Sequence, residues 1–535
     1  MPDDPTALLA FLGRGEAYGL PGREVEQVTT HAAIIFLVGE RAYKMKRPVR
    51  YSFLDFSTRA RRRRALEAEL RLNRRTAPML YRRLIRVTRS ADRRYALEGD
   101  GEPVEWLLEM ARFDQDLLLD RIAERGALDA ATIDALAEAI AGFHDRAEER
   151  PERGGHAGMR QVIEGNVEDL TGLADAVLPG SAVTELNRRT RAELERNRVL
   201  LEQRRCTGRV RHCHGDLHLG NIVLWDGRPV LFDCLEFDEA LASIDTFYDL
   251  AFTLMDLCRR ELRPLAQRLL TGYLDATWDD AGIALLPLFL SCRAAIRAKV
   301  QGLAAEREDD AEARAREIQA ARAYLDLAAS FLTPGPPRLV AIGGVSGTGK
   351  STLARELAPA LGRAPGAVLL RSDVTRKKLC GVAPTERLGA DAYAEQVSGA
   401  DRTPRRGRLR RAGLRARLRQ PGRASRRDPV RRPRRDRRCG LPRPAGACAH
   451  RAGRDRARPA VRWDLAGDGS RGPGTAGSTS ARRCFGRDGG GRAPPDRARS
   501  GRDRVASGGQ RRRARAGRGG GRGGPRVVAS PPGIG

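Results

Sequence analysis

The sequence predicts an α+β domain of two lobes, followed by an incomplete α/β domain and a disordered C-terminal tail. Three observations lead to this prediction. Strand-like runs rich in Ile, Val and Phe occur within residues 25–110, whereas residues 111–332 are mainly helical in pattern. Residues 338–398 contain a strand pattern, a glycine-rich loop and a helix pattern in that order. Residues 399–535 have no apolar periodicity and are rich in Arg, Gly and Pro.

The first lobe is predicted from three segments. Residues 30–50 are predicted to form two strands around a glycine turn, because β-branched and aromatic residues favour strands. Residues 57–75 are predicted to form a helix that Ser57 or Thr58 can cap. Residues 104–113 are predicted to form another buried strand.

The second lobe is predicted to be helical from about residue 114 to 205 and from 245 to 331, with short strands around a loop at 208–237. The stretch LTPGPPR, rich in Pro and Gly, marks the clearest domain boundary. The predicted divisions are an N-terminal segment (1–24), the two-lobed domain (25–332), a linker (333–337), the incomplete domain (338–398) and the tail (399–535).

The net charge of +30 is located in the tail. Of the 98 Lys and Arg residues, 40 are arginines within residues 401–535, where only 9 of the 68 acidic residues lie. The first 400 residues therefore carry 58 basic and 59 acidic side chains. A nucleic-acid function does not follow from the overall charge.

The sequence also argues against secretion and membrane insertion. Its start, MPDDPTALLAFLG, has two acidic residues and no basic cluster, unlike a secretory signal. The longest apolar runs, 33–38 and 282–290, are shorter than a membrane span. The 9 cysteines are scattered without a CxxC pair, which fits a reducing compartment. We expect a cytoplasmic protein without a membrane partner.

The segment HGDLHLGN, residues 214–221, carries the most specific chemistry of the first domain. Phosphoryl transfer needs a carboxylate at the acceptor hydroxyl and oxygen ligands for Mg²⁺ at the phosphates. The spacing matches the catalytic loop of protein kinases, H-R-D-x-x-x-x-N, with Gly in place of Arg. We expect Asp216 to be the catalytic base, and Asn221 and the following Asp233 to be Mg²⁺ ligands.

These motifs, together with FDCLEFD, SIDTFYDLAF and YKMKRPVRYSFLDFSTRARRRR, resemble the aminoglycoside phosphotransferase-like kinases that are fused to a C-terminal P-loop ATP-binding domain. The resemblance covers about residues 25–398. It implies a two-lobed, protein-kinase-like fold, ATP and Mg²⁺ between the lobes, and a small-molecule hydroxyl as acceptor. In that scheme Lys44 binds the ATP phosphates and Glu69 pairs with it. Lys46, on the same strand face, is the alternative lysine, and helix register favours Glu69 over Glu67.

Other polar residues near the motif have structural explanations. His214 is expected to brace the loop by hydrogen bonding. Asp245 and Asp249 are expected to cap a helix or to orient the loop. Glu236 could contact a cationic substrate, but a solvated acidic edge shared with its neighbours explains it equally well.

Residues 344–351, GVSGTGKS, form a complete Walker A loop between a strand pattern and a helix pattern. In such a loop the glycines let backbone N–H groups face the phosphates, the lysine reaches the β/γ oxygens, and a hydroxyl ligates Mg²⁺. The expected nucleotide-binding residues are Gly344, Ser346, Gly347, Thr348, Gly349, Lys350, Ser351 and Thr352, with Ser351 as the Mg²⁺ ligand.

The next strand pattern, residues 367–373, ends at Asp373, and Arg376 lies one turn further on. The segment resembles small-molecule P-loop kinases, in which an Asp-x-x-Arg contacts the acceptor, so both residues are substrate candidates. A helix-capping Asp beside a surface Arg is the alternative. Only about 60 residues resemble a P-loop domain, and its further strands and lid are absent from the sequence.

The tail has two interpretations. As a genuine RGG-like segment it would be disordered and would bind nucleic acid through phosphate charge. Alternatively, it is the product of a frame shift in a GC-rich gene, because such codons read out of frame give mostly Arg, Gly, Ala and Pro. The tail contains no Lys, Asn, Tyr or Met, and the change falls inside the helix pattern ADAYAEQVS. We favour the frame shift, which leaves nucleic acid out of the expected partners.

The sequence therefore predicts an ATP-dependent phosphotransferase that acts on a small-molecule hydroxyl. One alternative is a nucleotide-binding regulatory protein, formed by a pseudo-kinase and a P-loop sensor. The complete set of Asp216, Asn221 and Asp233 argues against it. A nucleic-acid-associated ATPase is the other alternative, if the tail is genuine.

Overall fold

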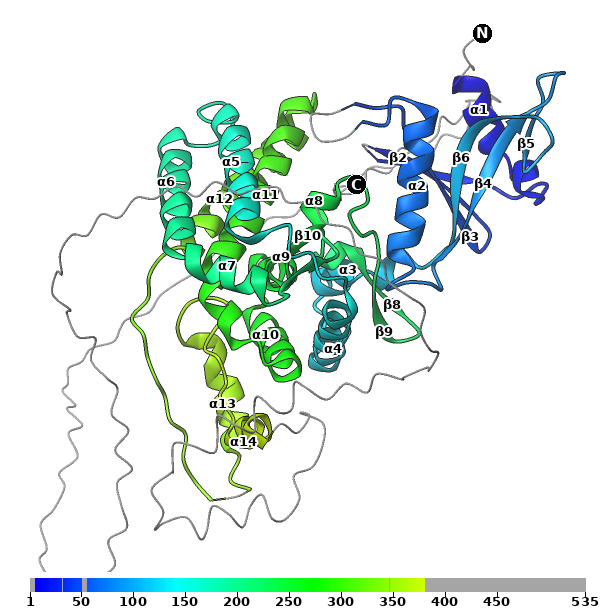
Figure 1. The fold of residues 1–535 in the computed structure, drawn as a ribbon. Coiled ribbons are helices and arrows are strands. Elements are labelled where there is room, and N and C mark those ends of the chain that lie inside the picture. Colours follow the sequence, from blue (N-terminus) through cyan, green and yellow to red (C-terminus); the bar gives the residue numbers. More distant parts are fainter. Residues whose placement is uncertain (1–4, 31, 51–54, 346, 381–535) are drawn as a thin grey trace, which may run out of the picture. The chain divides into compact units, whose positions relative to one another are not determined.

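The computed structural model describes residues 5–30, 32–50, 55–345 and 347–380 (Figure 1). Ser346, the last residues of the predicted P-loop domain and the whole predicted tail lie outside the described residues. All described residues belong to one compact unit. The structural statements that follow concern these residues alone.

The first lobe contains a six-stranded antiparallel sheet with the strand order β1-β2-β3-β6-β4-β5. The two strands expected within residues 30–50 are present and pair with each other across a turn at Gly39, whose φ is 54°. The strand expected at 104–113 is β6, which lies between β3 and β4. The strands are β1 (Glu26–Thr29), β2 (Ala33–Val38), β3 (Arg41–Lys46), β4 (Tyr81–Arg89), β5 (Tyr95–Leu97) and β6 (Glu102–Ala111).

Side chains alternate between the two faces of this sheet, and each face has its own core. On one face, Phe36 and Tyr43 pack with Leu8 and Leu12 of α1 (Pro5–Leu12), which the 3₁₀ turn η1 (Gly15–Tyr18) follows. The other face packs against α2 (Arg59–Asn73), which Figure 1 shows beside the sheet. Helix α2 begins as expected, because the Thr58 side chain accepts the Arg61 N–H at 3.3 Å.

The second lobe is mainly helical, as expected. Helix α9 lies at its centre, and twelve of its fourteen residues are buried. Two short strand pairs, β7 with β10 and β8 with β9, frame the segment that carries HGDLHLGN. The elements are η2 (Gln115–Leu117), α3 (Leu119–Glu124), α4 (Ala130–Arg146), α5 (Gly155–Gly172), α6 (Gly180–Arg196), α7 (Arg198–Cys206), β7 (Val210–His212), η3 (Leu219–Asn221), β8 (Ile222–Trp225), β9 (Arg228–Leu231), α8 (Glu239–Ala242), β10 (Ser243–Asp245), α9 (Thr246–Arg259), α10 (Arg263–Thr277), η4 (Asp280–Leu285), α11 (Leu286–Arg307) and α12 (Ala311–Phe331).

One helical stretch of the described chain, Asp280–Arg307, is long and apolar enough to cross a membrane, with a mean hydropathy of 1.5 over its most apolar window. Of that window, 67% is buried inside the protein. The stretch ends in α11, which packs against α12, α9 and α5. Its apolar side chains are therefore explained by the core of the second lobe.

The segment after the linker differs from the prediction. The strands expected at 338–344 and 367–373 do not form, and the only regular elements described there are α13 (Lys350–Leu357), η5 (Ala358–Ala360) and α14 (Ser372–Cys380). Leu339 is 80% exposed and Leu370 is 76% exposed, and both lie in these predicted strands. A strand needs partner strands to satisfy its backbone, and no described residue after 337 supplies one.

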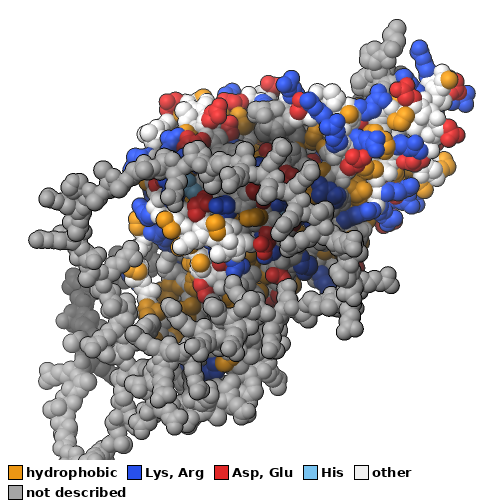
Figure 2. Space-filling view, in the orientation of Figure 1, with side chains coloured by type: hydrophobic (Ala, Val, Ile, Leu, Met, Phe, Trp, Pro, Cys, Tyr) orange, Lys and Arg blue, Asp and Glu red, His pale blue; other side chains and the backbone are white. Residues whose placement is uncertain are grey.

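The surface of the first lobe carries both signs of charge. On the face seen in Figure 2, Lys and Arg side chains lie among Asp and Glu side chains over this lobe. This agrees with the near balance of basic and acidic residues counted for the first 400 residues. The near balance of charge over the first 400 residues therefore gives no charge-based argument for nucleic acid.

Candidate active site

The loop between β7 and β8 brings Asp216 and Asn221 together. The Asn221 amide nitrogen donates to the backbone oxygen of Asp216 at 2.9 Å and to its Oδ2 at 3.0 Å. Both bonds use the amide nitrogen, which leaves the carbonyl oxygen of Asn221 as the atom that could ligate a metal. Gly215 has a φ of 87°, and an added Cβ would lie 2.9 Å from the Leu235 Cβ. This position therefore requires glycine.

Buried polar groups of the second lobe hold this loop from behind. Asp249, on α9, accepts the backbone N–H of His214 at 3.0 Å and that of Gly215 at 2.9 Å. Its carboxylate also lies 3.1 Å from His144 Nε2. The His214 ring contacts the Phe232 carbonyl through Nε2 at 2.9 Å. The bracing role expected for His214 and the orienting role expected for Asp249 agree with these contacts.

Asp245 has the capping role that was the other expectation. Its carboxylate accepts the Phe247 N–H at 2.8 Å and so caps α9. The same carboxylate is paired with the buried Arg204 at 2.7 Å. Asp245 is therefore structural.

His218 lies against Asp216. Its Nδ1 accepts the Gly220 N–H at 3.1 Å, so the ring proton of the neutral form is on Nε2, which is 3.5 Å from Asp216 Oδ2. Burial alone would raise the pKa of the Asp216 carboxyl, but His218 and Arg297 outweigh burial and hold the pKa below its ordinary value. Asp216 is thus a carboxylate at neutral pH.

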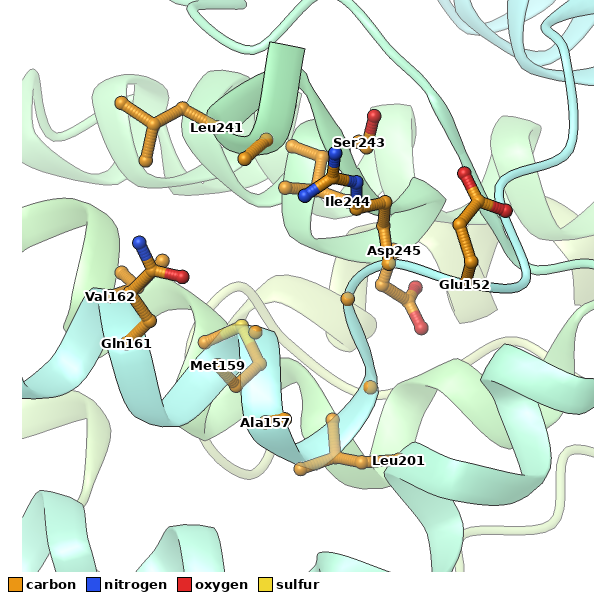
Figure 3. A pocket seen from close by; sticks show the side chains of 15 residues that line it. Glu152, Ala157, Met159, Gln161, Val162, Leu201, Leu241, Ser243, Ile244 and Asp245 are labelled. Carbon is orange, nitrogen blue, oxygen red and sulfur yellow. The ribbon is translucent and has the colours of Figure 1, made fainter. Parts of the chain in front are cut away.

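A cavity of about 190 Å³ borders this loop. Its lining includes His218 and Asn221 from the loop, Phe252 from α9 and Arg297 from α11. Another cavity, of about 210 Å³, lies at the start of α5 (Figure 3). Its described lining contains none of the predicted site residues, and Asp245, visible in Figure 3, is already paired with Arg204. The cavity at the loop is therefore the candidate acceptor pocket.

Two lysines of β3 share one carboxylate of α2. Lys44 Nζ lies 2.8 Å from Glu69 Oε1 and 2.9 Å from Asp233 Oδ1. Lys46 Nζ lies 2.8 Å from Glu69 Oε2 and 2.6 Å from Glu236 Oε1. The resemblance implies a phosphate lysine paired with Glu69, and both lysines meet that condition; of the two, only Lys44 is also paired with Asp233. Glu67 instead pairs with Arg63 at the surface.

The charges of this cluster keep Lys44 and Asp233 ionised. Burial lowers the pKa of Lys44, but Asp233, Glu69 and Glu236 together outweigh burial and raise it above the ordinary value. Burial raises the pKa of Asp233, and Lys44 and Lys46 outweigh it, so that pKa lies below its ordinary value. An ionised Asp233 and the Asn221 carbonyl are hard oxygen donors, which fit Mg²⁺.

Three residues that sequence reasoning did not assign to the site connect the first lobe to the second: two hold the segment after β9, and one contacts the end of β7. The Tyr81 hydroxyl accepts the Asp233 N–H at 3.1 Å, and Asn73 Oδ1 accepts the Cys234 N–H at 2.8 Å. Arg75 donates to the backbone oxygen of His212 at 2.8 Å. These contacts join residues more than 130 positions apart, so no local pattern could have pointed to them.

Glu236 does not lie on a solvated edge. Its side chain is 4% exposed and is paired with Lys46, so that alternative is wrong for this residue. Its neighbours are also engaged, because Asp238 caps α8 and Glu239 pairs with Arg150 at 2.6 Å. A substrate contact for Glu236 remains a prediction.

The Walker A loop has the expected glycine geometry. Gly344, Gly347 and Gly349 have φ values of 145°, 85° and 81°. Lys350 begins α13, and its ammonium donates to the Val345 carbonyl at 2.6 Å. The Thr348 hydroxyl donates to the same carbonyl at 2.9 Å, and Ser351 and Thr352 are exposed in the first turn of α13. Ser346, also predicted to bind nucleotide, lies outside the described residues.

Asp373 does not end a strand as expected. It lies in the first turn of α14, 3.7 Å from Lys377 one turn further on. Arg376 is on the same helix. The reason for the difference is the missing sheet, since the segment before α14 has no strand to pair with among the described residues.

Comparison with known proteins identifies two domains. The model of the phosphotransferase enzyme family (APH) matches residues 55–286, and the model of an AAA domain matches residues 339–426. The first match lies within the predicted two-lobed domain. The second extends beyond residue 398, where the sequence pattern predicts that the domain breaks off.

Relatives and solved structures are also similar to the chain. Uncharacterized proteins of Mycobacterium tuberculosis and Mycobacterium bovis are 32% identical over 358 residues, which are 66% of this chain and 68% of theirs. The GDP complex of aminoglycoside 2'-phosphotransferase-IIIa covers 61% of this chain and 99% of its own, with 13% identity and a TM-score of 0.40. A choline kinase from Cryptosporidium parvum covers 61% and 95%, with 12% identity and a TM-score of 0.37.

The phosphotransferase model covers the loop with Asp216 and Asn221, and the sequence relatives cover 66% of this chain. The chain belongs to the phosphotransferase enzyme family, and an AAA domain follows its phosphotransferase domain.

Proposed function

We propose that residues 25–332 transfer the γ-phosphoryl group of ATP to a hydroxyl of a small molecule in the cytoplasm. Asp216 is the base, Asn221 and Asp233 would hold Mg²⁺, and Lys44 positions the phosphates. The observation that supports this most is the convergence of Lys44, Glu69 and Asp233, which come from three separate segments and meet within 2.9 Å.

In the proposed reaction, the Asp216 carboxylate accepts the proton of the acceptor hydroxyl. The hydroxyl oxygen forms a bond to the γ-phosphorus, while the bond from the γ-phosphorus to the β,γ-bridging oxygen breaks and ADP leaves with that electron pair. Lys44, held by Glu69, stabilises the charge on the phosphates. Mg²⁺, when bound, neutralises the charge that develops on the phosphate oxygens.

The cavity beside His218 and Arg297 supports the position of the acceptor, because it opens at the loop that carries Asp216. Its lining carries acidic and basic side chains together, including Asp120, Asp256 and Arg260. Because both signs of charge line the cavity, its lining does not indicate whether the acceptor is a cation, an anion or a neutral molecule. Kinases of this fold accept many hydroxyl compounds, so the family alone does not make aminoglycosides the substrate.

The test is ADP formation by the full chain with Mg²⁺ and ATP against aminoglycosides, sugars and amino alcohols. Asp216→Ala should reduce acceptor-dependent turnover by about 10³-fold, the scale of a general base. Binding of a non-hydrolysable ATP analogue should stay within about threefold, because Asp216 is not paired with Lys44. Undiminished turnover in Asp216→Ala would refute the assignment.

A further inference from the structure

Lys46 and Glu236 form a second buried ion pair that the proposed reaction does not use. Their charged atoms are 2.6 Å apart, and their side chains are 1% and 4% exposed. Lys46 also lies 2.8 Å from Glu69 Oε2 and faces the Phe56 ring at 5.3 Å. Glu69 therefore carries one lysine on each of its two carboxylate oxygens.

This pair connects the two lobes. Lys46 is on β3 of the first lobe, whereas Glu236 follows β9 in the second lobe. The same short segment is tied to the first lobe at Asp233, through Lys44, and at Cys234, through Asn73. Residues 233–236 therefore contact the first lobe at three positions, and Glu236 is the last of the three.

A buried ion pair of this kind is not explained by stability. Removing two charges from water costs several kcal/mol each, so apolar residues of similar volume are often as stabilising. Here the pair is specific in geometry, because each lysine takes a different oxygen of Glu69. Lys44 donates a hydrogen bond to Oε1, whereas Lys46 attracts Oε2 by charge alone, and attraction at both oxygens favours one plane of that carboxylate.

The plane of Glu69 matters most when nucleotide binds. Asp233 is a partner of Lys44 in this structure, and its carboxylate is also a proposed Mg²⁺ ligand. When Asp233 turns to the metal, Glu69 becomes the partner that keeps Lys44 in place. An orientation of Glu69 that does not depend on Asp233 is then needed, and Lys46 provides it.

We propose that Lys46 is a positioning residue for nucleotide binding: it fixes Glu69, and through Glu69 it fixes Lys44, while Glu236 anchors Lys46 to the second lobe. This inference rests on the proposed function, because it assumes that Lys44 receives the nucleotide phosphates. It assigns Glu236 to the nucleotide side of the site rather than to the acceptor.

The experiment measures the Kd of a non-hydrolysable ATP analogue with Mg²⁺ by titration calorimetry. All proteins are full-length and carry Lys350→Ala, so that the Walker A loop does not contribute. The variants are Lys46→Met, Lys46→Met with Glu236→Gln, and Glu236→Gln alone. Lys299→Met, which removes a lysine paired with Asp169 away from the site, is the matched control.

Lys46→Met is expected to raise the Kd about tenfold, the lower end of what the loss of a supporting residue costs. It should also lower the melting temperature, because it leaves buried carboxylates unpaired. In the double variant the melting temperature should recover while the Kd stays raised. Lys299→Met should leave both the Kd and the melting temperature close to those of the parent protein.

Recovery of the Kd in the double variant would overturn the proposal, because Lys46 would then only balance charge. A wild-type Kd in Lys46→Met would overturn it as well. If neither Lys46 variant folds, Glu236→Gln decides: about a threefold rise in Kd supports the proposal, and an unchanged Kd overturns it.

The proposed function has a separate readout in the same series. If the Lys350→Ala protein binds no nucleotide, or if Lys44→Met binds as well as its parent, the role of Lys44 is wrong and both ideas fail. Binding that is lost in Lys44→Met but unaffected by Lys46→Met overturns only the positioning role.

Discussion

Asp249→Asn tests whether the catalytic loop depends on one buried carboxylate. Asp249 Oδ1 accepts the Gly215 N–H, and Oδ2 accepts the His214 N–H and lies 3.1 Å from His144 Nε2. An asparagine keeps the shape but has only one oxygen. In either orientation its NH₂ group faces one of the two backbone N–H groups, and that donor is left without an acceptor.

The magnitude follows from two terms. Burial alone would raise the pKa of Asp249, but the contact with His144 and the charges of His214 and Arg293 outweigh it and lower the pKa from 3.8 to about 2. At 1.36 kcal/mol per pKa unit, losing the charge costs about 2 kcal/mol. An unsatisfied buried donor adds about 1–3 kcal/mol. Together the two terms predict that the free energy of unfolding falls by about 3–5 kcal/mol.

The assay is equilibrium urea unfolding at pH 7, followed by far-UV circular dichroism. Asp134→Asn is the control, because Asp134 also pairs with an arginine, Arg268, but its side chain is 52% exposed. An exposed pair contributes about 0–1 kcal/mol. If Asp249→Asn is no less stable than Asp134→Asn, the loop does not depend on the carboxylate and the reasoning is refuted.

The same comparison has a pH signature. A carboxyl whose pKa is depressed on folding stabilises the protein above its unfolded pKa, here about 4, and the contribution is lost as the pH falls through the folded pKa of about 2. The difference in stability between the wild type and Asp249→Asn should therefore shrink between about pH 4 and pH 2. A constant difference over that range would contradict the assigned cause.

Three further predictions concern the same domain. Glu69→Gln should weaken binding of the Mg²⁺–ATP analogue by about tenfold in calorimetry, whereas Glu67→Gln should bind like the wild type; equal effects would contradict the Lys44 geometry. Gly215→Ala should lower the free energy of unfolding by about 2 kcal/mol, because its φ of 87° disfavours a side chain; an unchanged urea midpoint would count against this. Because the pKa of Asp216 lies below 3.8, phosphoryl transfer should not decline with acidification until below about pH 4, and a decline assigned to this group above pH 5 would contradict it.

The residues of the site that were predictable are those whose spacing is local or whose order along the chain is diagnostic. Asp216 and Asn221 meet because Asn221 lies five positions further on, at the end of a 3₁₀ turn, and that spacing is contained in the motif. The family resemblance implied Lys44 and Glu69, whereas strand periodicity places Lys44 and Lys46 on the same face and does not choose between them.

The remaining contacts depend on tertiary packing that periodicity does not encode. Tyr81 and Asn73 contact the segment after β9 only because the two lobes meet there. The pairing of Lys46 with Glu236, 190 residues away, has the same origin. A sequence pattern gives the face of a strand, but it does not give the partner in another lobe.

The second domain shows the same limit. Its two predicted strands do not form among the described residues, because no described strand pairs with them. Leu339, Val340 and Leu370 are exposed because no described strand covers them, and an evolved domain rarely leaves so many apolar side chains of one pattern in water. A frame shift that removed the remaining strands, the hypothesis that the composition favours, would explain both this exposure and the 40 arginines that follow. Translating the gene in the other two frames, from start points between codons 398 and 426, should give alternating strand patterns and helices that complete the AAA domain. If neither frame gives such patterns, the frame-shift hypothesis is wrong and the Arg-rich tail is part of the protein. The exposure of Leu339 and Leu370 then needs another explanation than missing strands.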